Sequence, residues 1–102
     1  MMVAMKATSL IDERVYFSER KFADIVIWLL PKPAIGSAHP FKYRLAYVVD
    51  EQCVMRYDNE VGKGDHRHLG LRQTTYRFTT LKRLIADFDA DIGRWNNENS
   101  DI

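Results

Sequence analysis

Residues 41–57 read FKYRLAYVVDEQCVMRY, two stretches of alternating side chains joined by a short polar connection. The first stretch, Phe41–Val49, has the period of two that is typical of a β-strand. One face would carry Tyr43, Leu45, Tyr47 and Val49, and the other Lys42, Arg44, Ala46 and Val48. Asp50-Glu51 is the expected hairpin connection. Gln52–Tyr57 then returns antiparallel, with one face formed by Cys53, Met55 and Tyr57. This stretch predicts an antiparallel sheet.

Further strands are expected on both sides of this hairpin. Phe22–Leu30 is apolar on both faces, which indicates a central position in the sheet. Pro31 and Pro33 end it, because proline cannot donate a hydrogen bond to a neighbouring strand. Val3–Phe17 is rich in β-formers but is interrupted by three charged residues, so it predicts one long or bulged strand or two short ones. Gln73–Phe78 is a further short strand.

The C-terminal part predicts one long amphipathic helix. Its apolar residues recur at spacings of three and four: Leu81, Leu84, Ile85, Phe88, Ile92 and Trp95. Thr79 or Thr80 can cap its start through a side-chain oxygen. The charged residues of the helix are expected to face solvent; they are Lys82, Arg83, Asp87, Asp89 and Asp91.

The predicted fold is α+β, in a single domain over residues 1–95 with a polar C-terminal tail over residues 96–102. It consists of an antiparallel sheet of four or five strands with the C-terminal amphipathic helix packed on one face.

Composition limits the classes of function. The chain has 102 residues, which is enough for one hydrophobic core, and its 46% hydrophobic and 28% charged content is that of a globular protein. A net charge of +1 means that any nucleic-acid binding must come from a local patch. The single cysteine, Cys53, excludes an intrachain disulfide and is expected to be a small core residue. The longest apolar run, Ile25–Leu30, is too short to span a bilayer, so a cytoplasmic location is expected.

Residues 56–68, RYDNEVGKGDHRH, are the candidate functional stretch. Eight of the thirteen side chains carry charge or titrate, and Gly62 and Gly64 allow a tight turn around Lys63. The chain is expected to leave the strand at Asp58 and to form a glycine-containing loop. On an extended backbone, His66 and His68 would point to the same face.

These residue types suit metal-independent RNA cleavage, with no cofactor. His66 and His68 can act as acid and base, because histidine titrates near neutral pH. Asp58 or Asp65 can orient a histidine. Phosphate can be held by cations and by the Gly62–Gly64 backbone amides, and an unpaired base can stack on an aromatic ring. The candidate substrate-binding residues are therefore Arg56, Lys63, Arg67 and Tyr57.

Other interpretations stay open. The two histidines can instead hold the loop through Asp58, Glu60 or Asp65, or join a carboxylate in a zinc or manganese site. His39, before a proline, is expected to serve a turn. Lys42 and Arg44 fit an ordinary half-exposed strand as well as a basic binding face, whereas Trp28 and Trp95 are expected in the core. A chain that acts only by binding a cellular target, or as a structural subunit of a complex, needs no catalysis.

Four segments carry a resemblance to a known family. RYDNE with GKGDHRH, FADIVIWLLPKP, HPFKYRLAYVVD and YRFTTLKRLIADFDADI together resemble the TumE-type toxins of bacterial and archaeal type II toxin–antitoxin systems, over residues 5–95. The resemblance implies a toxin and a cognate antitoxin with a helix-turn-helix DNA-binding domain. Small type II toxins often cut RNA, which by analogy favours a ribonuclease over a non-catalytic toxin. Whether the chain is an enzyme and whether it forms a homodimer are open at this point.

Overall fold

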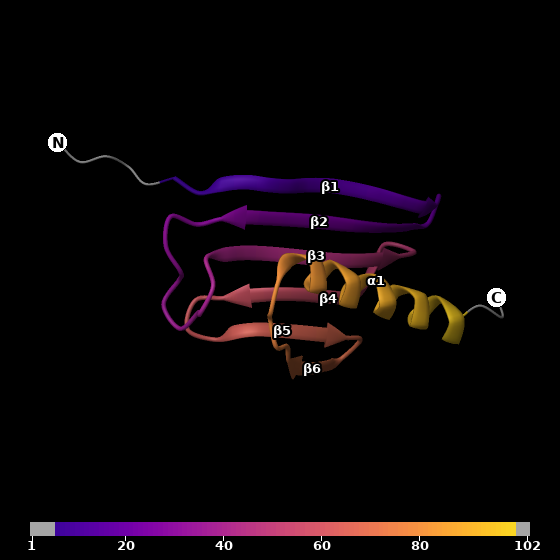
Figure 1. Ribbon diagram of the computed structural model, residues 1–102. Coiled ribbons are helices and arrows are strands. Elements are labelled where there is room, and N and C mark those ends of the chain that lie inside the picture. Colours follow the sequence, from indigo (N-terminus) through magenta and orange to yellow (C-terminus); the bar gives the residue numbers. More distant parts are fainter. Residues whose placement is uncertain (1–5, 100–102) are drawn as a thin grey trace.

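Residues 6–99 fold into one six-stranded antiparallel sheet with a single helix packed on one face (Figure 1). The computed structural model describes residues 6–99. Neighbouring strands follow in chain order, β1-β2-β3-β4-β5-β6, so every connection is a hairpin or a short loop. The strands are β1 (Thr8–Ser18), β2 (Lys21–Leu29), β3 (Phe41–Val49), β4 (Gln52–Glu60), β5 (Gly64–Leu69) and β6 (Arg72–Thr75); the helix is α1 (Leu81–Glu98).

The prediction of an antiparallel sheet with one C-terminal helix is confirmed, but the predicted number of strands, four or five, is wrong. The difference lies in the stretch that was expected to be a loop. Asp58, Asn59 and Glu60 continue β4, and Gly64–Leu69 forms β5, so only residues 61–63 make the turn. Polar residues on both faces hid the strand signal, because neither face shows the apolar alternation that marks a half-buried strand.

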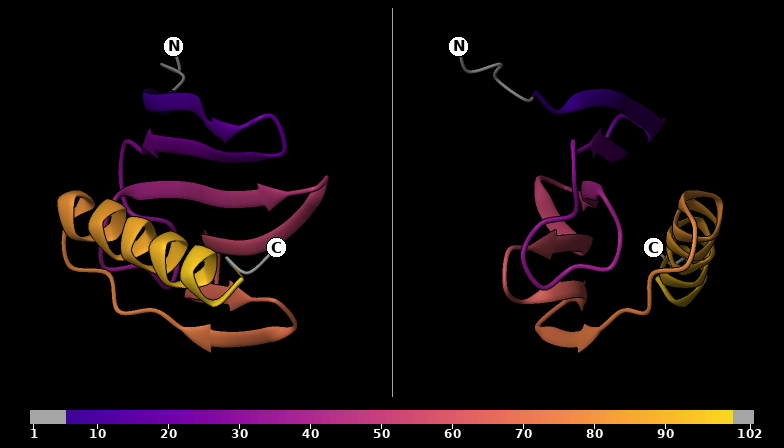
Figure 2. Two further views of the ribbon diagram at one scale, coloured as in Figure 1. Left: turned by 90° about the vertical axis from the view of Figure 1, so that its right-hand side faces the viewer. Right: turned by 60° about the vertical axis from the view of Figure 1, so that its left-hand side comes forward.

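Alternation along the strands gives the sheet two different faces. The covered face, beneath α1, carries the buried core; its largest side chains are Tyr43, Leu45 and Tyr47 from β3, Met55 and Tyr57 from β4, and Ile27 from β2. The open face carries the residues between them and is mixed: its polar side chains on β3 and β4 include Lys42, Arg44, Arg56, Asp58 and Glu60, beside the apolar Ala46 and Val48. Within residues 6–99, no helix or strand lies over the open face (Figure 2).

Helix α1 forms where the sequence predicted it. Thr80 is the N-cap, and its side-chain oxygen accepts a hydrogen bond from the Arg83 amide at 3.1 Å. Leu84, Phe88 and Ile92 are buried against the covered face. The helix continues to Glu98, into the stretch that was predicted as a polar tail. One expectation is wrong: Asp91 is 4% exposed and points toward the sheet.

Two other side chains differ from expectation. Trp28 was expected in the core but lies on the open face opposite Lys42, and it is 37% exposed. Cys53 was also expected in the core, but it is exposed. A bulge is the reason: the register passes from Tyr47↔Met55 to Val48↔Cys53, so Val54 is an extra residue that turns Cys53 to the other face.

Strand β1 is an edge of the sheet. It pairs only with β2, and register shifts mark it between Ser9 and Ile11 and between Tyr16 and Ser18, as the predicted long or bulged strand implied. Residues 3–5 of that predicted strand lie outside the described part of the chain. In the part that is described, no helix is both long and apolar enough to cross a membrane.

Candidate functional site

The β4–β5 hairpin divides the candidate residues between the two faces of the sheet. Arg56 lies opposite His68 and Asp58 opposite His66, and all four belong to the open face. Tyr57 lies opposite Arg67, and Asn59 opposite Asp65, on the covered face. Lys63 is in the turn. The candidates are thus close in space, but they form two groups separated by the thickness of one sheet.

The open-face group is a compact cluster of three titratable side chains. Arg56 Nη2 donates to His68 Nε2 at 3.2 Å, and Arg56 Nε lies 3.1 Å from Asp58 Oδ2, within range for an ion pair. His68 Nε2 is also 3.6 Å from Asp58 Oδ1. His68 Nε2 therefore accepts from Arg56, whose guanidinium can only donate, and the Asp58 carboxylate lies beside the same nitrogen.

A second arginine extends the cluster toward a hollow in the open face. Arg44 lies opposite Asp58, and no hydrogen bond or ion pair joins its side chain to another residue within 6–99. The hollow measures about 230 Å³ and is lined on this face by Val26, Trp28, Lys42, Arg44, Asp58 and Glu60. We refer to Arg44, Arg56, Asp58 and His68 as the open cluster.

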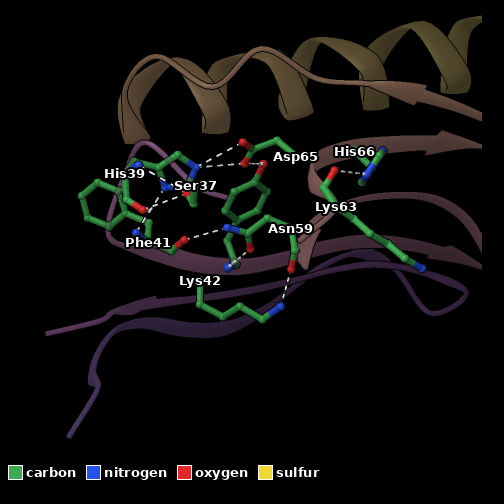
Figure 3. A network of polar contacts seen from close by, with 9 residues as sticks. Ser37, His39, Phe41, Lys42, Asn59, Lys63, Asp65 and His66 are labelled. Atoms are coloured by element: carbon green, nitrogen blue, oxygen red, sulfur yellow. Dashed lines mark hydrogen bonds and ion pairs between the residues drawn. The ribbon is translucent and has the colours of Figure 1, made fainter. Parts of the chain in front are cut away.

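His66 is on the same face but is already occupied. Its Nε2 lies 2.7 Å from the carbonyl oxygen of Lys63, which can only accept, so Nε2 carries the proton (Figure 3). Its Nδ1 then accepts from the side-chain amide of Gln73 at 3.4 Å. Nε2 of His66 thus holds the turn, and Nδ1 connects β5 to β6, which fits the structural interpretation of this residue.

The turn itself does not offer the expected amides to a phosphate. The Gly62 amide donates to the carbonyl oxygen of Ile35 at 3.0 Å, and the Lys63 amide donates to that of Glu60 at 3.1 Å. Gly62 has φ +79°, and a Cβ on Gly36 would meet Gly62 Cα at 3.4 Å. The glycines therefore allow the loop before β3 to pack against this turn. In this conformation the Gly62 and Lys63 amides are therefore not available for the predicted phosphate contact.

On the covered face, Asp65 binds a histidine that the sequence did not connect with it. His39 Nε2 lies 3.0 Å from Asp65 Oδ1, and Tyr43 Oη donates to the same oxygen at 2.6 Å (Figure 3). The Phe41 amide donates to His39 Nδ1, so the Nε2–H faces the carboxylate. The ring of His39 also stacks on Phe78, with centroids 3.9 Å apart. Burial, and then the hydrogen bond to Asp65, raise the pKa of Tyr43 well above its usual value.

One signal could have indicated this contact. Side chains alternate between the two faces of a strand. If residues 65–68 form a strand with His66 and His68 on the open face, then Asp65 and Arg67 point toward the core. A carboxylate in that position needs a partner.

A second covered-face network ties the hairpin to the helix. Asp91 accepts a short hydrogen bond from Tyr57 Oη, and its Oδ2 lies 3.3 Å from Arg67 Nη1. Arg94, on the same helix, donates to Asp91 Oδ1 at 2.7 Å. Burial, with Asp91 as the next cause, raises the pKa of Tyr57 well above its usual value. These contacts indicate that Tyr57 and Arg67 join β4 and β5 to α1.

The residues of this region do not gather like metal ligands. Across residues 6–99, no group of three or more His, Cys, Asp or Glu side chains is placed to hold a metal ion. His66 and His68 each direct a ring nitrogen at a protein group instead.

Comparison with known protein families identifies a family that covers nearly the whole chain. The model of the family described as toxin TumE matches residues 5–96, nearly the whole chain. No curated protein and no solved structure matches it.

Proposed function

This chain belongs to the TumE toxin family, and on that premise we propose that it is a toxin that cleaves RNA on the open face of its sheet. The family implies an antitoxin partner. The proposal goes further in naming the substrate, the reaction and the residues. Its main support is the open cluster, in which an imidazole that can gain a proton lies within 3.6 Å of a carboxylate and 3.2 Å of a guanidinium.

The reaction that fits these groups is attack by a ribose 2′-hydroxyl on the adjacent phosphorus. The 2′-oxygen–phosphorus bond forms, and the bond from phosphorus to the 5′-oxygen breaks, which leaves a 2′,3′-cyclic phosphate and a 5′-hydroxyl. His68 takes the proton of the 2′-hydroxyl at Nε2, which gives up its hydrogen bond from Arg56, and Asp58 stabilises the resulting imidazolium. Arg56 and Arg44 bind the phosphate oxygens on which negative charge develops.

The leaving 5′-oxygen needs a proton, and His66 is the proposed donor. It lies on the same face, opposite Asp58. To act as an acid it must first take up a proton at Nδ1, which costs the hydrogen bond from Gln73. Asp65, Arg67 and Tyr57 support the reaction indirectly, because their contacts fix the hairpin that carries the open cluster. Lys63 stays exposed at the turn, 3.5 Å from Glu60, where it can attract an RNA strand.

One observation favours a second function, inhibition by binding without cleavage. His66 donates to the carbonyl oxygen of Lys63 and accepts from Gln73, so it cannot gain a proton for a leaving group without breaking a hydrogen bond. A toxin that only occupies its target would still use Arg44 and Arg56 but would not need an acid.

The test is growth arrest and total-RNA integrity after the chain is induced without its antitoxin. Cleavage predicts arrest with RNA fragments bearing cyclic phosphate ends, and loss of both in His68→Ala and in the double variant His66→Ala, His68→Ala. Arg44→Ala is compared with a control variant, Arg72→Ala. Arg72 is exposed, and because it pairs with Leu69 it does not belong to the open face. Arrest with intact RNA that is lost in Arg44→Ala but kept in His68→Ala would support binding alone.

We also propose that the antitoxin carries a helix-turn-helix DNA-binding domain and that this chain binds no DNA itself. Its one helix among residues 6–99 packs on the sheet rather than on a second helix. Co-expression with the neighbouring gene product, followed by a DNA-binding assay on each protein alone and on the complex, tests this division. A homodimer of the toxin would be detected in the same preparations by light scattering.

A further inference from the structure

The hollow in the open face lies beside the open cluster, and its lining combines aromatic, aliphatic and charged side chains. One wall is Trp28, whose side chain reaches the surface instead of the core. Val26 adds apolar surface, and Lys42 and Arg44 provide cations. At about 230 Å³ the hollow is smaller than the pockets that hold drug-sized ligands, and it suits a single planar ring system.

The phase of β2 places Trp28 on the open face, because the positions next to it, Ile27 and Leu29, belong to the covered face. Trp28 stays 37% exposed there, so part of its ring system is open to a ligand. Aromatic rings on open sheet faces are the surfaces on which RNA-binding proteins stack unpaired bases. Arg44, which has no side-chain partner within 6–99, lines the same hollow and the open cluster, so a base in the hollow and a phosphate in the cluster can belong to one nucleotide.

Glu60 provides a selective group at the edge of this hollow. Its side chain is 53% exposed, and its ion pair with Lys63 is 3.5 Å long and also exposed. An exposed pair of this kind contributes little free energy, so the carboxylate can exchange Lys63 for another donor. A carboxylate only accepts hydrogen bonds, through two oxygens side by side.

We propose that this hollow binds one unpaired RNA base stacked on Trp28, and that Glu60 makes guanine the preferred base. This inference rests on the proposed RNA-cleaving function and names its substrate specificity. Guanine presents two adjacent donors, N1–H and the N2 amino group, to both oxygens of one carboxylate. Adenine, cytosine and uracil place an acceptor beside each donor on this edge, so one carboxylate oxygen would face a lone pair.

The test measures binding without cleavage. The probes are fluorescein-labelled hexanucleotides with 2′-O-methyl groups throughout, which cannot form the cyclic phosphate; each has a uracil background and one central G, A, C or U. The full chain is titrated by fluorescence anisotropy. We expect the guanine probe to bind about tenfold more tightly than the others, as two hydrogen bonds to a charged group allow.

Two variants connect this preference to the hollow. Glu60→Gln is expected to bring the four dissociation constants within about twofold, because the amide offers a donor where guanine needs an acceptor. Glu51→Gln, at the exposed turn between β3 and β4, is the matched control and keeps the preference. Trp28→Ala is expected to weaken all four probes about equally, by the loss of stacking.

The outcomes separate the two proposals. Equal binding of the four probes, or an unchanged guanine preference in Glu60→Gln, overturns the inference and leaves the cleavage proposal standing. A guanine preference that depends on Glu60 supports the inference, even where growth arrest proceeds with intact RNA and cleavage is refuted.

Discussion

The two faces of the β4–β5 hairpin use similar residues for different purposes. On the covered face, the Asp91 side chain is buried, the Asp65 side chain is 15% exposed, and each accepts hydrogen bonds from two or more side chains. On the open face, Asp58 is as little exposed as Asp65, but its partners Arg56 and His68 are 34% and 25% exposed, so solvent reaches them. Successive residues of one strand thus go alternately into the fold and toward solvent.

The comparison shows that residue type alone does not identify a functional site. A histidine beside an aspartate occurs on both faces, as His39–Asp65 at 3.0 Å and as His68–Asp58 at 3.6 Å. The first pair has both ring nitrogens occupied and stacks on Phe78, which makes it a rigid support. The second lies next to a hollow and to Arg44, whose side chain has no hydrogen-bond or ion-pair partner in the described part of the chain, which makes the pair available to a ligand. Our predictions test this division.

The largest expected loss of stability comes from Asp91→Ala. The variant removes a carboxylate that is 4% exposed and leaves Arg67 without its partner beneath the helix. Breaking a buried pair in this way costs about 3–5 kcal/mol of unfolding free energy, measured by urea denaturation. The matched control is Asp89→Ala on the exposed side of α1, with a change within about 0.5 kcal/mol. Similar values for the two variants would contradict a structural role for the covered-face network.

A smaller loss is expected from Asp65→Ala. His39 and Tyr43 would each lose a hydrogen-bond partner in a half-enclosed site, at a cost of roughly 2–3 kcal/mol. The loop before β3 would also lose a contact, so its backbone amides would exchange faster with solvent. Unfolding in urea and hydrogen exchange over residues 34–40 check both effects. Unchanged exchange in that loop would show that His39–Asp65 does not hold it.

Alkaline pH provides a third test of the covered face. The pKa values of Tyr43 and Tyr57 are raised above 10.0, mainly by burial, so the folded state keeps its phenol protons longer than the unfolded state does. Their contribution to stability is complete below pH 10 and is lost as the pH rises further, by up to about 1.4 kcal/mol per pH unit for each tyrosine. Urea denaturation between pH 9 and 11 measures the slope. Tyr43→Phe is expected to reduce it, and a slope unchanged by that variant would refute the assignment.

The smallest effect on stability is expected on the open face, from His68→Ala. Its contacts are partly exposed, so the change in unfolding free energy should stay below about 1 kcal/mol. RNA cleavage, in contrast, should fall by about 10² or more, as for the loss of a general base. Arg72→Ala, at the exposed start of β6 opposite Leu69, is the control and is expected to keep cleavage within a few-fold. If activity fell only in proportion to stability, His68 would have a structural role and not a catalytic one.

Much of the fold follows from local patterns in the sequence. The period of two predicted β3 with the bounds that the structure has, and the spacing of three and four predicted the helix. The hairpin after Asp58 was missed because it is polar on both sides: one face meets buried carboxylate networks, and the other meets solvent. Local patterns cannot reveal such contacts, because the partners are far apart in the chain. Asp65 contacts His39, 26 residues away, and Tyr57 contacts Asp91, 34 residues away.

The candidate site was predictable in part for the same reason. The alternation of His66 and His68 indicated a shared face, and the register confirms it. Arg56 and Asp58 join this face because β4 pairs with β5. A loop was expected from Asp58 onward, so that pairing could not be predicted. The hollow beside Trp28 could not be predicted, because it depends on which side of β2 the helix covers. The assignment of catalytic and substrate-binding residues stays a prediction that experiments on each face must test.

The most direct measurement compares Asp58→Asn with Asp65→Asn. The same isosteric change is made to two carboxylates of one hairpin that point to opposite faces of the sheet. RNA cleavage per folded molecule and urea unfolding are measured for both. The account predicts that Asp58→Asn loses cleavage and keeps most of its stability, whereas Asp65→Asn loses stability and, where folded, still cleaves. The reverse pattern, or equal effects in both assays, would contradict the division of the hairpin into a supporting face and a reactive face.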